Sequence, residues 1–284
     1  MFPIGMSTSG LDPTEEVLAD YAREGITHIE VSIGNDDFDR IDWPAVRALC
    51  GKYGITPWSV HLPFAPFTLL DPSSLDEDKR VFTVDRFRAL MTAAAAVGAD
   101  KFVVHASAEP IPDAERAARM AQSKRSMAEL AGYAAGLGAV VCVEDLPRTC
   151  LGHDSAELLD LLSADDRLRC CLDTNHLLSE ELPDFIRAVG DKIVTLHVSD
   201  YDRVNERHWL PGEGVIRWPD VLDALRSVGY DGPWMYEIGL ATPGTILRDR
   251  ELTRRDFYVN AHELFDGRPL TTFSHPKPDL GMWG

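Results

Sequence analysis

The stretch AVVCVEDLP, residues 139–147, holds the pattern that decides the fold. A run of small and β-branched apolar residues leads directly into the acidic pair Glu144 and Asp145, and Pro147 closes the stretch. A strand that is apolar on both faces is typical of a parallel sheet covered by helices on both sides. Runs of the same form are KFVVH (101–105), RCCLD (169–173) and KIVTLH (192–197).

The same alternation of short apolar runs and longer amphipathic stretches extends along the whole chain. The predicted strands are Phe2–Ser7, Ile26–Ser32, Pro57–Leu62, Lys101–Ala106, Ala139–Asp145, Leu168–Thr174, Lys192–Ser199 and Pro233–Ile238. The predicted helices, with apolar residues three and four apart, include Thr14–Arg23, Trp43–Tyr53, Val84–Val97, Ala114–Leu137, Ser155–Leu162 and Trp218–Val228. Eight strands alternating with helices predict parallel βαβ units and a (β/α)₈ TIM barrel.

The alternative architecture is an open, doubly wound sheet. Such a sheet usually carries a glycine-rich turn after its first strand, and here STSGLDP (7–13) follows instead. The 284 residues suit one barrel of about 250 residues, and no linker divides them. We therefore expect a barrel over residues 1–265. Residues 266–284, rich in Pro and Gly, are expected to form an arm against the barrel or a neighbouring subunit, which is compatible with a homo-oligomer.

Charge and composition narrow the partners. The formal net charge of −18 argues against a broad phosphate-binding surface, and hence against a nucleic acid partner. No apolar run approaches the ~20 residues that span a bilayer, and the first residues do not resemble a secretory signal. We expect a cytoplasmic protein without a membrane partner. Its five cysteines show no CxxC spacing and are expected to be buried, reduced thiols.

Metal-type side chains end six of the eight predicted strands. They are His61, His105, Glu144, Asp173, His197 and Glu237. A barrel gathers the C-terminal ends of its strands around one axis, where active sites lie. Converging carboxylates would repel each other unless a cation neutralises them. We predict that Glu144, Asp173, His197 and Glu237 bind one divalent ion, and this donor set suits Mn²⁺, Zn²⁺, Co²⁺ or Mg²⁺. For each carboxylate alone, a salt bridge at the rim is the alternative.

The remaining candidates have simpler alternatives. His61 and His105 are predicted to contact substrate or a second metal, although a lone His in an apolar strand is more often a hydrogen-bonded core residue. His176 follows Asp173 by three residues and is predicted to contact substrate or metal. Arg203 is either a cation facing the pocket or a solvated loop residue. Glu30 also ends a strand, but it is left outside the predicted site.

Five segments carry a resemblance to a known family. They are VCVEDLP, CLDTNH, LHVSDYDR, HWLPGEGVIRW and YEI. In this order and spacing the chain resembles, over nearly its whole length, the xylose isomerase-like barrels of the sugar phosphate isomerase/epimerase group. The resemblance implies a cofactor of one divalent metal ion bound by the four residues predicted above, with the two glutamates also acting as acid and base.

The resemblance also implies substrate contacts. In relatives that epimerise ketoses, residues at the positions of His176 and Arg203 contact substrate oxygens, and a His at the position of His208 is common in the sugar-processing branch. Such epimerases tend to carry a second Glu six residues after the first. Here that position is Cys150, which weighs against a free ketohexose as substrate.

The expected activity is therefore that of a metal-dependent isomerase or epimerase of a sugar, sugar phosphate or inosose, acting by proton transfer through an enediolate. One alternative is a metal-dependent dehydratase, and another is a barrel that only binds its ligand. A third is a trinuclear zinc abasic-site endonuclease like endonuclease IV, whose further metals would use His61, His105, His176 and the segment Glu206-Arg207-His208, with Glu206 in place of the usual Asp.

Overall fold

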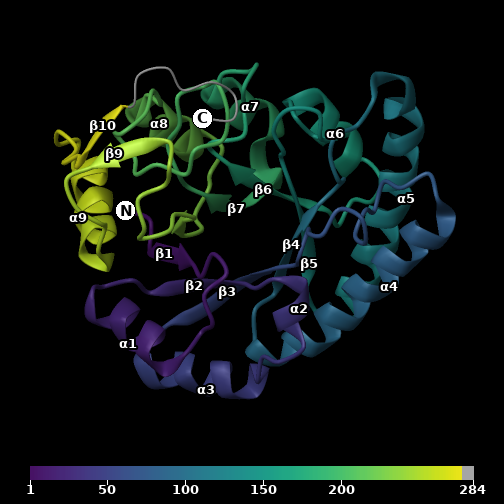
Figure 1. Cartoon of the computed structure of the whole chain (residues 1–284), viewed down its shortest axis with the longest axis horizontal. Helices are drawn as coiled ribbons and strands as arrows, with labels where there is room; N and C mark the ends of the chain where they lie inside the picture. Colours follow the sequence, from purple (N-terminus) through teal and green to yellow (C-terminus); the bar gives the residue numbers. More distant parts are fainter. Residues whose placement is uncertain (277–284) are drawn as a thin grey trace.

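Eight parallel strands form a barrel with the helices on its outside (Figure 1). The structure is a computed structural model that describes residues 1–276. The barrel strands are β1 (Ile4–Ser7), β2 (His28–Ser32), β3 (Thr56–His61), β4 (Lys101–His105), β5 (Val140–Glu144), β6 (Arg169–Asp173), β7 (Ile193–His197) and β8 (Trp234–Tyr236). Neighbours in the chain pair in parallel from β1 to β7, and β8 pairs with β1. The predicted (β/α)₈ barrel is confirmed.

The barrel closes between β7 and β8 at one place. A single parallel bridge joins Val198 and Tyr236, just beyond the end of β7. There Val198 N–H donates to the Met235 carbonyl at 2.8 Å, and Glu237 N–H donates to the Val198 carbonyl at 3.2 Å. The closing hydrogen bonds therefore lie at the C-terminal end of the strands, beside the predicted site.

Helices separate the strands and surround them. They are α1 (Glu15–Arg23), α2 (Asn35–Phe38), α3 (Trp43–Tyr53), α4 (Glu77–Ala94), α5 (Asp113–Gly136), α6 (Ser155–Leu162), α7 (Leu182–Val189), α8 (Trp218–Ser227) and α9 (Arg254–Phe265), with the 3₁₀ turns η1 (Ala95–Val97) and η2 (Gly190–Lys192). Asp154 caps α6 by accepting from Glu157 N–H at 2.9 Å. Gly54 ends α3 in the left-handed conformation that favours glycine.

Alternation along each strand explains where the site side chains point. In β5, Val141 and Val143 belong to the large core between the sheet and the helices. Cys142 belongs to a separate small cluster with Val103 and Cys171 of the neighbouring strands. Because side chains alternate between the two faces of a strand, Glu144 shares the inward face of Cys142. The interior of the barrel is thus filled by small apolar side chains. At the C-terminal ends of the strands, the inward-facing side chains are carboxylates and imidazoles.

The segment after the barrel packs against the barrel's own elements. Strand β10 (Ser274–Pro276) pairs antiparallel with β9 (Ile246–Arg248), and Thr271 donates through its N–H and hydroxyl to Glu263. The predicted arm therefore begins on this molecule, and residues 277–284 lie outside the described part. Within that part, no helix is long and apolar enough to cross a membrane. All five cysteines are buried and unpaired with one another.

Candidate active site

The structure brings the four predicted metal ligands together. Glu144, Asp173 and His197 are the last residues of β5, β6 and β7, and Glu237 directly follows β8. Each offers one atom within 4.8 Å of the others. His197 Nδ1 lies 3.0 Å from Glu144 Oε1, 3.4 Å from Glu237 Oε2 and 3.9 Å from Asp173 Oδ2. Three carboxylates and one imidazole thus converge on the barrel axis.

The hydrogen bonding of Asp173 fits a bound cation. Its Oδ1 accepts from Asn175 N–H at 2.8 Å, whereas its fully buried Oδ2 has no hydrogen-bond partner among the described residues. Leaving such an oxygen unsatisfied costs roughly 1–3 kcal/mol, and more when it is charged. Oxygen donors with one imidazole suit Mn²⁺, Mg²⁺, Co²⁺ or Zn²⁺, so the residues present fit a divalent ion.

The two glutamates of this set differ in acidity. Burial would raise the pKa of Glu144, but the neighbouring His197 and His105 outweigh it and hold that pKa well below its usual value. Burial raises the pKa of Glu237 to about 7; His197 opposes this rise, and Glu144 and Asp173 add to it. One carboxylate therefore stays ionised while the other exchanges its proton near neutral pH, which is a pattern of acid–base sites.

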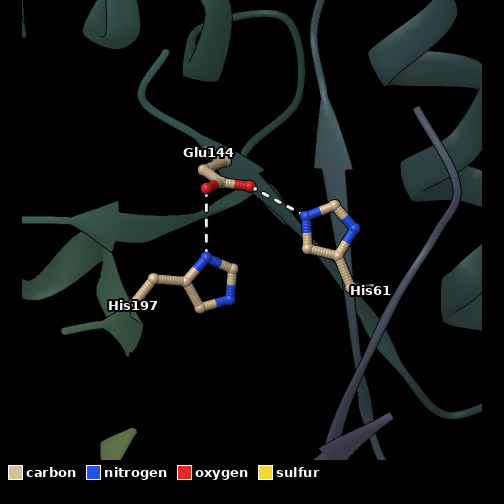
Figure 2. Close-up of side chains that lie close together, drawn as sticks. All are labelled: His61, Glu144 and His197. Carbon is tan, nitrogen blue, oxygen red and sulfur yellow. Dashed lines mark hydrogen bonds and ion pairs between the residues drawn. The ribbon is translucent and has the colours of Figure 1, made fainter. Parts of the chain in front are cut away.

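Two further histidines contact the carboxylate of Glu144. His61 Nε2 and His105 Nε2 are each 3.1 Å from Glu144 Oε2, while His197 lies on the other oxygen. Figure 2 shows Glu144 between the rings of His61 and His197, which come from different strands. The Nδ1 of His61 donates to the Leu62 carbonyl at 2.7 Å, which leaves its Nε2 to face Glu144. His61 and His105 thus belong to the same cluster as the four ligands.

A second metal-type group lies beside the first. His176, Glu206 and His208 each offer an atom within 4.8 Å of the others. The Nε2 of His176 is 3.3 Å from Glu206 Oε2 and 3.6 Å from Asp173 Oδ2, so His176 stands between the two groups. Glu206 comes from the loop after β7, and in the sequence analysis it was named only in the endonuclease alternative.

Arg203 lies outside the cavity, and not at the substrate-contacting position that the resemblance implied. Its guanidinium contacts Glu181 at 2.5 Å and the Glu180 carbonyl at 3.0 Å, and it does not line the cavity above the metal-type residues. The arginine that does line this cavity is Arg148, four residues after Glu144, which the sequence analysis did not single out. Its position in the loop directly after a strand end is the signal that could have found it.

Glu30 also has a place in the site, although the sequence analysis left it out. It is fully buried, and its Oε1 lies 2.9 Å from His197 Nε2. Ser59 Oγ donates to its other oxygen at 2.7 Å. A carboxylate on the far nitrogen of a metal-type histidine fixes the tautomer and orientation of the ring. Glu30 therefore positions His197.

The site opens into one cavity of about 580 Å³. The polar residues that line it, here called the polar floor, include Glu144, Glu237, His105, His176 and His208. The apolar side chains that line it, here called the apolar wall, come from the loops after β3 and β5 and are Phe64, Phe67, Leu146, Pro147 and Cys150. The cavity thus offers both polar and apolar contacts to a ligand.

This chain belongs to the xylose isomerase-like TIM barrel family, which it matches over residues 18–256. The family resemblance read from the sequence is therefore confirmed. Among curated relatives, an uncharacterized protein of Methanocaldococcus jannaschii is 27% identical over 59% of this chain and 60% of its own length. The D-psicose 3-epimerase of Enterocloster bolteae is 29% identical over 44% of this chain and 42% of its own. The chain spans only about half of the length of these relatives.

Solved structures of the same fold include sugar epimerases. A D-allulose 3-epimerase from Methylomonas sp. aligns over 94% of this chain and 98% of its own, with a TM-score of 0.75 and 21% identity. The 3-keto-D-glucoside 4-epimerase of E. coli covers 94% of this chain and all of its own, with a TM-score of 0.73 and 17% identity. At these identities the likeness establishes the fold.

Proposed function

We propose that this protein is a divalent-metal-dependent epimerase or isomerase of a sugar or related polyol. The observation that carries the proposal is the cluster of Glu144, Asp173, His197 and Glu237 within 4.8 Å at the end of the barrel. The relatives named as sugar 3-epimerases support it, although they align over less than two thirds of their length. The ion would be Mn²⁺, Zn²⁺, Co²⁺ or Mg²⁺.

The proposed reaction moves one proton on a carbon next to a carbonyl. When bound, the divalent ion supplies Lewis-acid polarisation of that carbonyl. One of Glu144 and Glu237 takes the proton and leaves an enediolate, and the other returns a proton to the opposite face, which inverts the carbon. Return to the neighbouring carbon gives isomerisation, and loss of a β-hydroxyl gives dehydration, so product analysis separates these outcomes.

His176 is placed to stabilise the enediolate. In the metal-free chain burial would lower its pKa, but Asp173, Glu206 and Glu144 outweigh burial and raise that pKa well above the usual value. An imidazole that lines the cavity and donates an N–H stabilises negative charge that develops on substrate oxygens. Arg203 contacts Glu181 outside the cavity, so the proposal gives it no substrate contact.

The test is metal content per chain followed by a screen of ketoses and inososes in deuterated water. We expect one metal per chain and deuterium at the carbon next to the carbonyl. Because a general base contributes roughly 10²–10⁴-fold, Glu237→Gln should lower turnover by that factor and weaken metal binding. Near-full activity and metal content in Glu237→Gln would overturn the assignment.

A second candidate rests on the group of His176, Glu206 and His208. Together with His61 and His105 on Glu144, it supports a centre of several metals, as in an abasic-site endonuclease like endonuclease IV. The formal net charge of −18 opposes DNA binding. His61→Ala and His105→Ala should leave the single metal of a sugar enzyme in place, whereas a trinuclear enzyme should lose at least one metal. Three zinc ions with nicking of an abasic-site oligonucleotide would favour this candidate.

A further inference from the structure

The charges around the cavity bear on the kind of substrate. Four carboxylates line it: Glu109, Glu144, Glu206 and Glu237. Among the described residues that line it, Arg148 is the one arginine or lysine. Its guanidinium contacts Glu109 at 2.5 and 3.0 Å and Glu206 at 3.4 Å. Two carboxylates therefore already pair with this cation, so a phosphate group brought here would have to compete with them for the guanidinium.

In many barrels, phosphate binds to the loops after strands 7 and 8 together with a helix N-terminus. The corresponding loops of this chain disfavour a bound phosphate. In the loop after β7, Gly212 N–H donates to Asp200 at 2.8 Å, and Glu213 forms a fully buried ion pair with Arg248 at 2.7 Å. The next helix, α8, has Pro219 and Asp220 in its first turn. A missing N–H and an acidic side chain both disfavour an anion at that helix end.

The apolar wall is a surface from which the hydroxyl groups of a sugar gain no hydrogen bonds. The Phe64 ring stacks on His105 with 4.4 Å between centroids and 11° between planes, and Phe67 lies 6.2 Å from Phe64. Phe64 lines the cavity and is 42% exposed, so its ring is accessible to a ligand. Leu146 and Cys150 also belong to the apolar wall, and burial raises the pKa of the Cys150 thiol so that it stays uncharged.

The size of the cavity exceeds that of a simple sugar. A volume of about 580 Å³ lies in the range of roughly 300–1,000 Å³ that encloses drug-sized ligands. The polar floor with His176 and Glu237 is suited to the hydroxyl and carbonyl groups that react. The apolar wall is left for a part of the substrate that carries few polar groups.

We propose that the substrate is an unphosphorylated sugar joined to an apolar group, and that this group packs against Phe64 and Phe67 while the sugar lies over Glu144 and Glu237. This inference rests on the proposed sugar chemistry and adds the substrate class. Phe64 is then a residue that determines specificity.

A matched set of probes tests it. The set is D-fructose with an O-benzyl, an O-methyl or a phosphate group on carbon 6, so that only the nature of one substituent changes. Deuterium uptake at carbon 3 from deuterated water, measured with the metal-loaded full chain, gives kcat and KM for each probe. Because an aromatic contact contributes a few-fold to tenfold in affinity, we expect the benzyl probe to have a KM about three- to tenfold below that of the methyl probe. The phosphate probe should have the highest KM.

Two variants locate the effect. Phe64→Ala should remove the difference between the benzyl and methyl probes, so that the ratio of their KM values becomes about one, since the aromatic contact is lost. Leu69→Ala is the matched control, because Leu69 belongs to the same loop and is 37% exposed but does not line the cavity. It should leave both KM values unchanged.

The possible results distinguish a failure of this substrate class from a failure of the proposed sugar chemistry. Deuterium uptake with a phosphate probe that is equal to or better than the benzyl probe overturns the inference and leaves the sugar chemistry standing. The same holds if Phe64→Ala does not change the ratio between benzyl and methyl probes. Absence of deuterium uptake with every probe and with the free ketoses and inososes of the screen overturns the proposed function, and the inference with it.

Discussion

Two aspartates at neighbouring strand ends show how the same buried side chain serves different purposes. Asp173 ends β6, and Asp200 lies three residues after the end of β7; both are fully buried. Asp200 accepts four hydrogen bonds, from the backbone N–H groups of Tyr201, Gly212 and Ile216 and from the indole of Trp218, at 2.8–3.2 Å. Asp173 Oδ2 accepts none among the described residues. Burial of a carboxylate therefore does not by itself indicate a binding site. A buried carboxylate oxygen that lacks hydrogen-bond donors does.

The donors of Asp200 also explain the segment HWLPGEGVIRW. A side chain at Gly214 would collide with the Tyr201 carbonyl and with Asp200 itself, so the loop folds tightly around that carboxylate. Glu213 is buried in its ion pair with Arg248. Most of this segment thus holds the loop after β7 in shape, and His208 at its start is the residue that reaches the cavity.

The largest expected effect comes from removing Asp200. Asp200→Ala leaves four donors without their acceptor, two of them buried and two partly buried, and breaking such an arrangement costs about 3–5 kcal/mol of unfolding free energy. Urea unfolding followed by circular dichroism measures this loss. The variant should still bind metal when folded, and an unchanged midpoint would contradict the structural role of Asp200.

Removing the charge of Asp173 should have the reverse effect, with a larger change in metal binding than in stability. Asp173→Asn should lower metal affinity by about 100-fold or more, since even residues that only orient ligands contribute 10–100-fold. The unfolding free energy of the metal-free protein should fall less than in Asp200→Ala, because Oδ2 accepts no hydrogen bond and only its ion pairs with His176 at 3.6 Å and His197 at 3.9 Å are lost. Isothermal titration with Mn²⁺ and urea unfolding in chelator give the two values. Loss of stability without loss of metal affinity would reverse the comparison.

The acidity of Glu237 gives a smaller effect that depends on pH. Its pKa is raised from 4.5 to about 7, so between these values the folded chain holds a proton that the unfolded chain releases. The unfolding free energy of the metal-free protein should therefore fall as pH rises through this window, by at most about 1.4 kcal/mol per pH unit from this group. Glu237→Gln should remove that slope, and equal slopes in both proteins would contradict the assignment.

The smallest effect is expected at Arg203. It is partly exposed and pairs with the exposed Glu181, so Arg203→Ala should change the unfolding free energy by less than about 1 kcal/mol. Turnover should stay within about twofold because the side chain does not line the cavity. Steady-state kinetics on the best substrate of the screen checks this. A loss of tenfold or more would mean that Arg203 reaches the substrate after all.

The sequence was informative wherever alternation within a strand decides the outcome. Glu144, Asp173 and His197 could be predicted to converge because each is the last residue of a strand and shares the inward face. Arg148 and Arg203 could not be told apart, since both lie in loops with positive φ whose direction no periodicity sets.

Two other features were missed for different reasons. Helix α7 was not among the predicted helices, although its buried residues Leu182, Phe185, Ile186 and Val189 repeat at helical spacing, so the pattern was present and was overlooked. Glu30 ends a strand as the ligands do, but its function is visible only through its contact with His197 from the opposite side of the barrel.

The closure of the barrel sets the order in which the site is completed during synthesis. Strand β8 pairs with β1, so the first strand to leave the ribosome waits for nearly the whole chain before it gains its second neighbour. Glu237 directly follows β8 and is the last of the four metal-type residues to be made. Because contacts between distant parts of a chain form late, a nascent chain holds an incomplete set of ligands until the ring closes. Under the proposed function, capture of the metal would thereby be tied to the final step of folding.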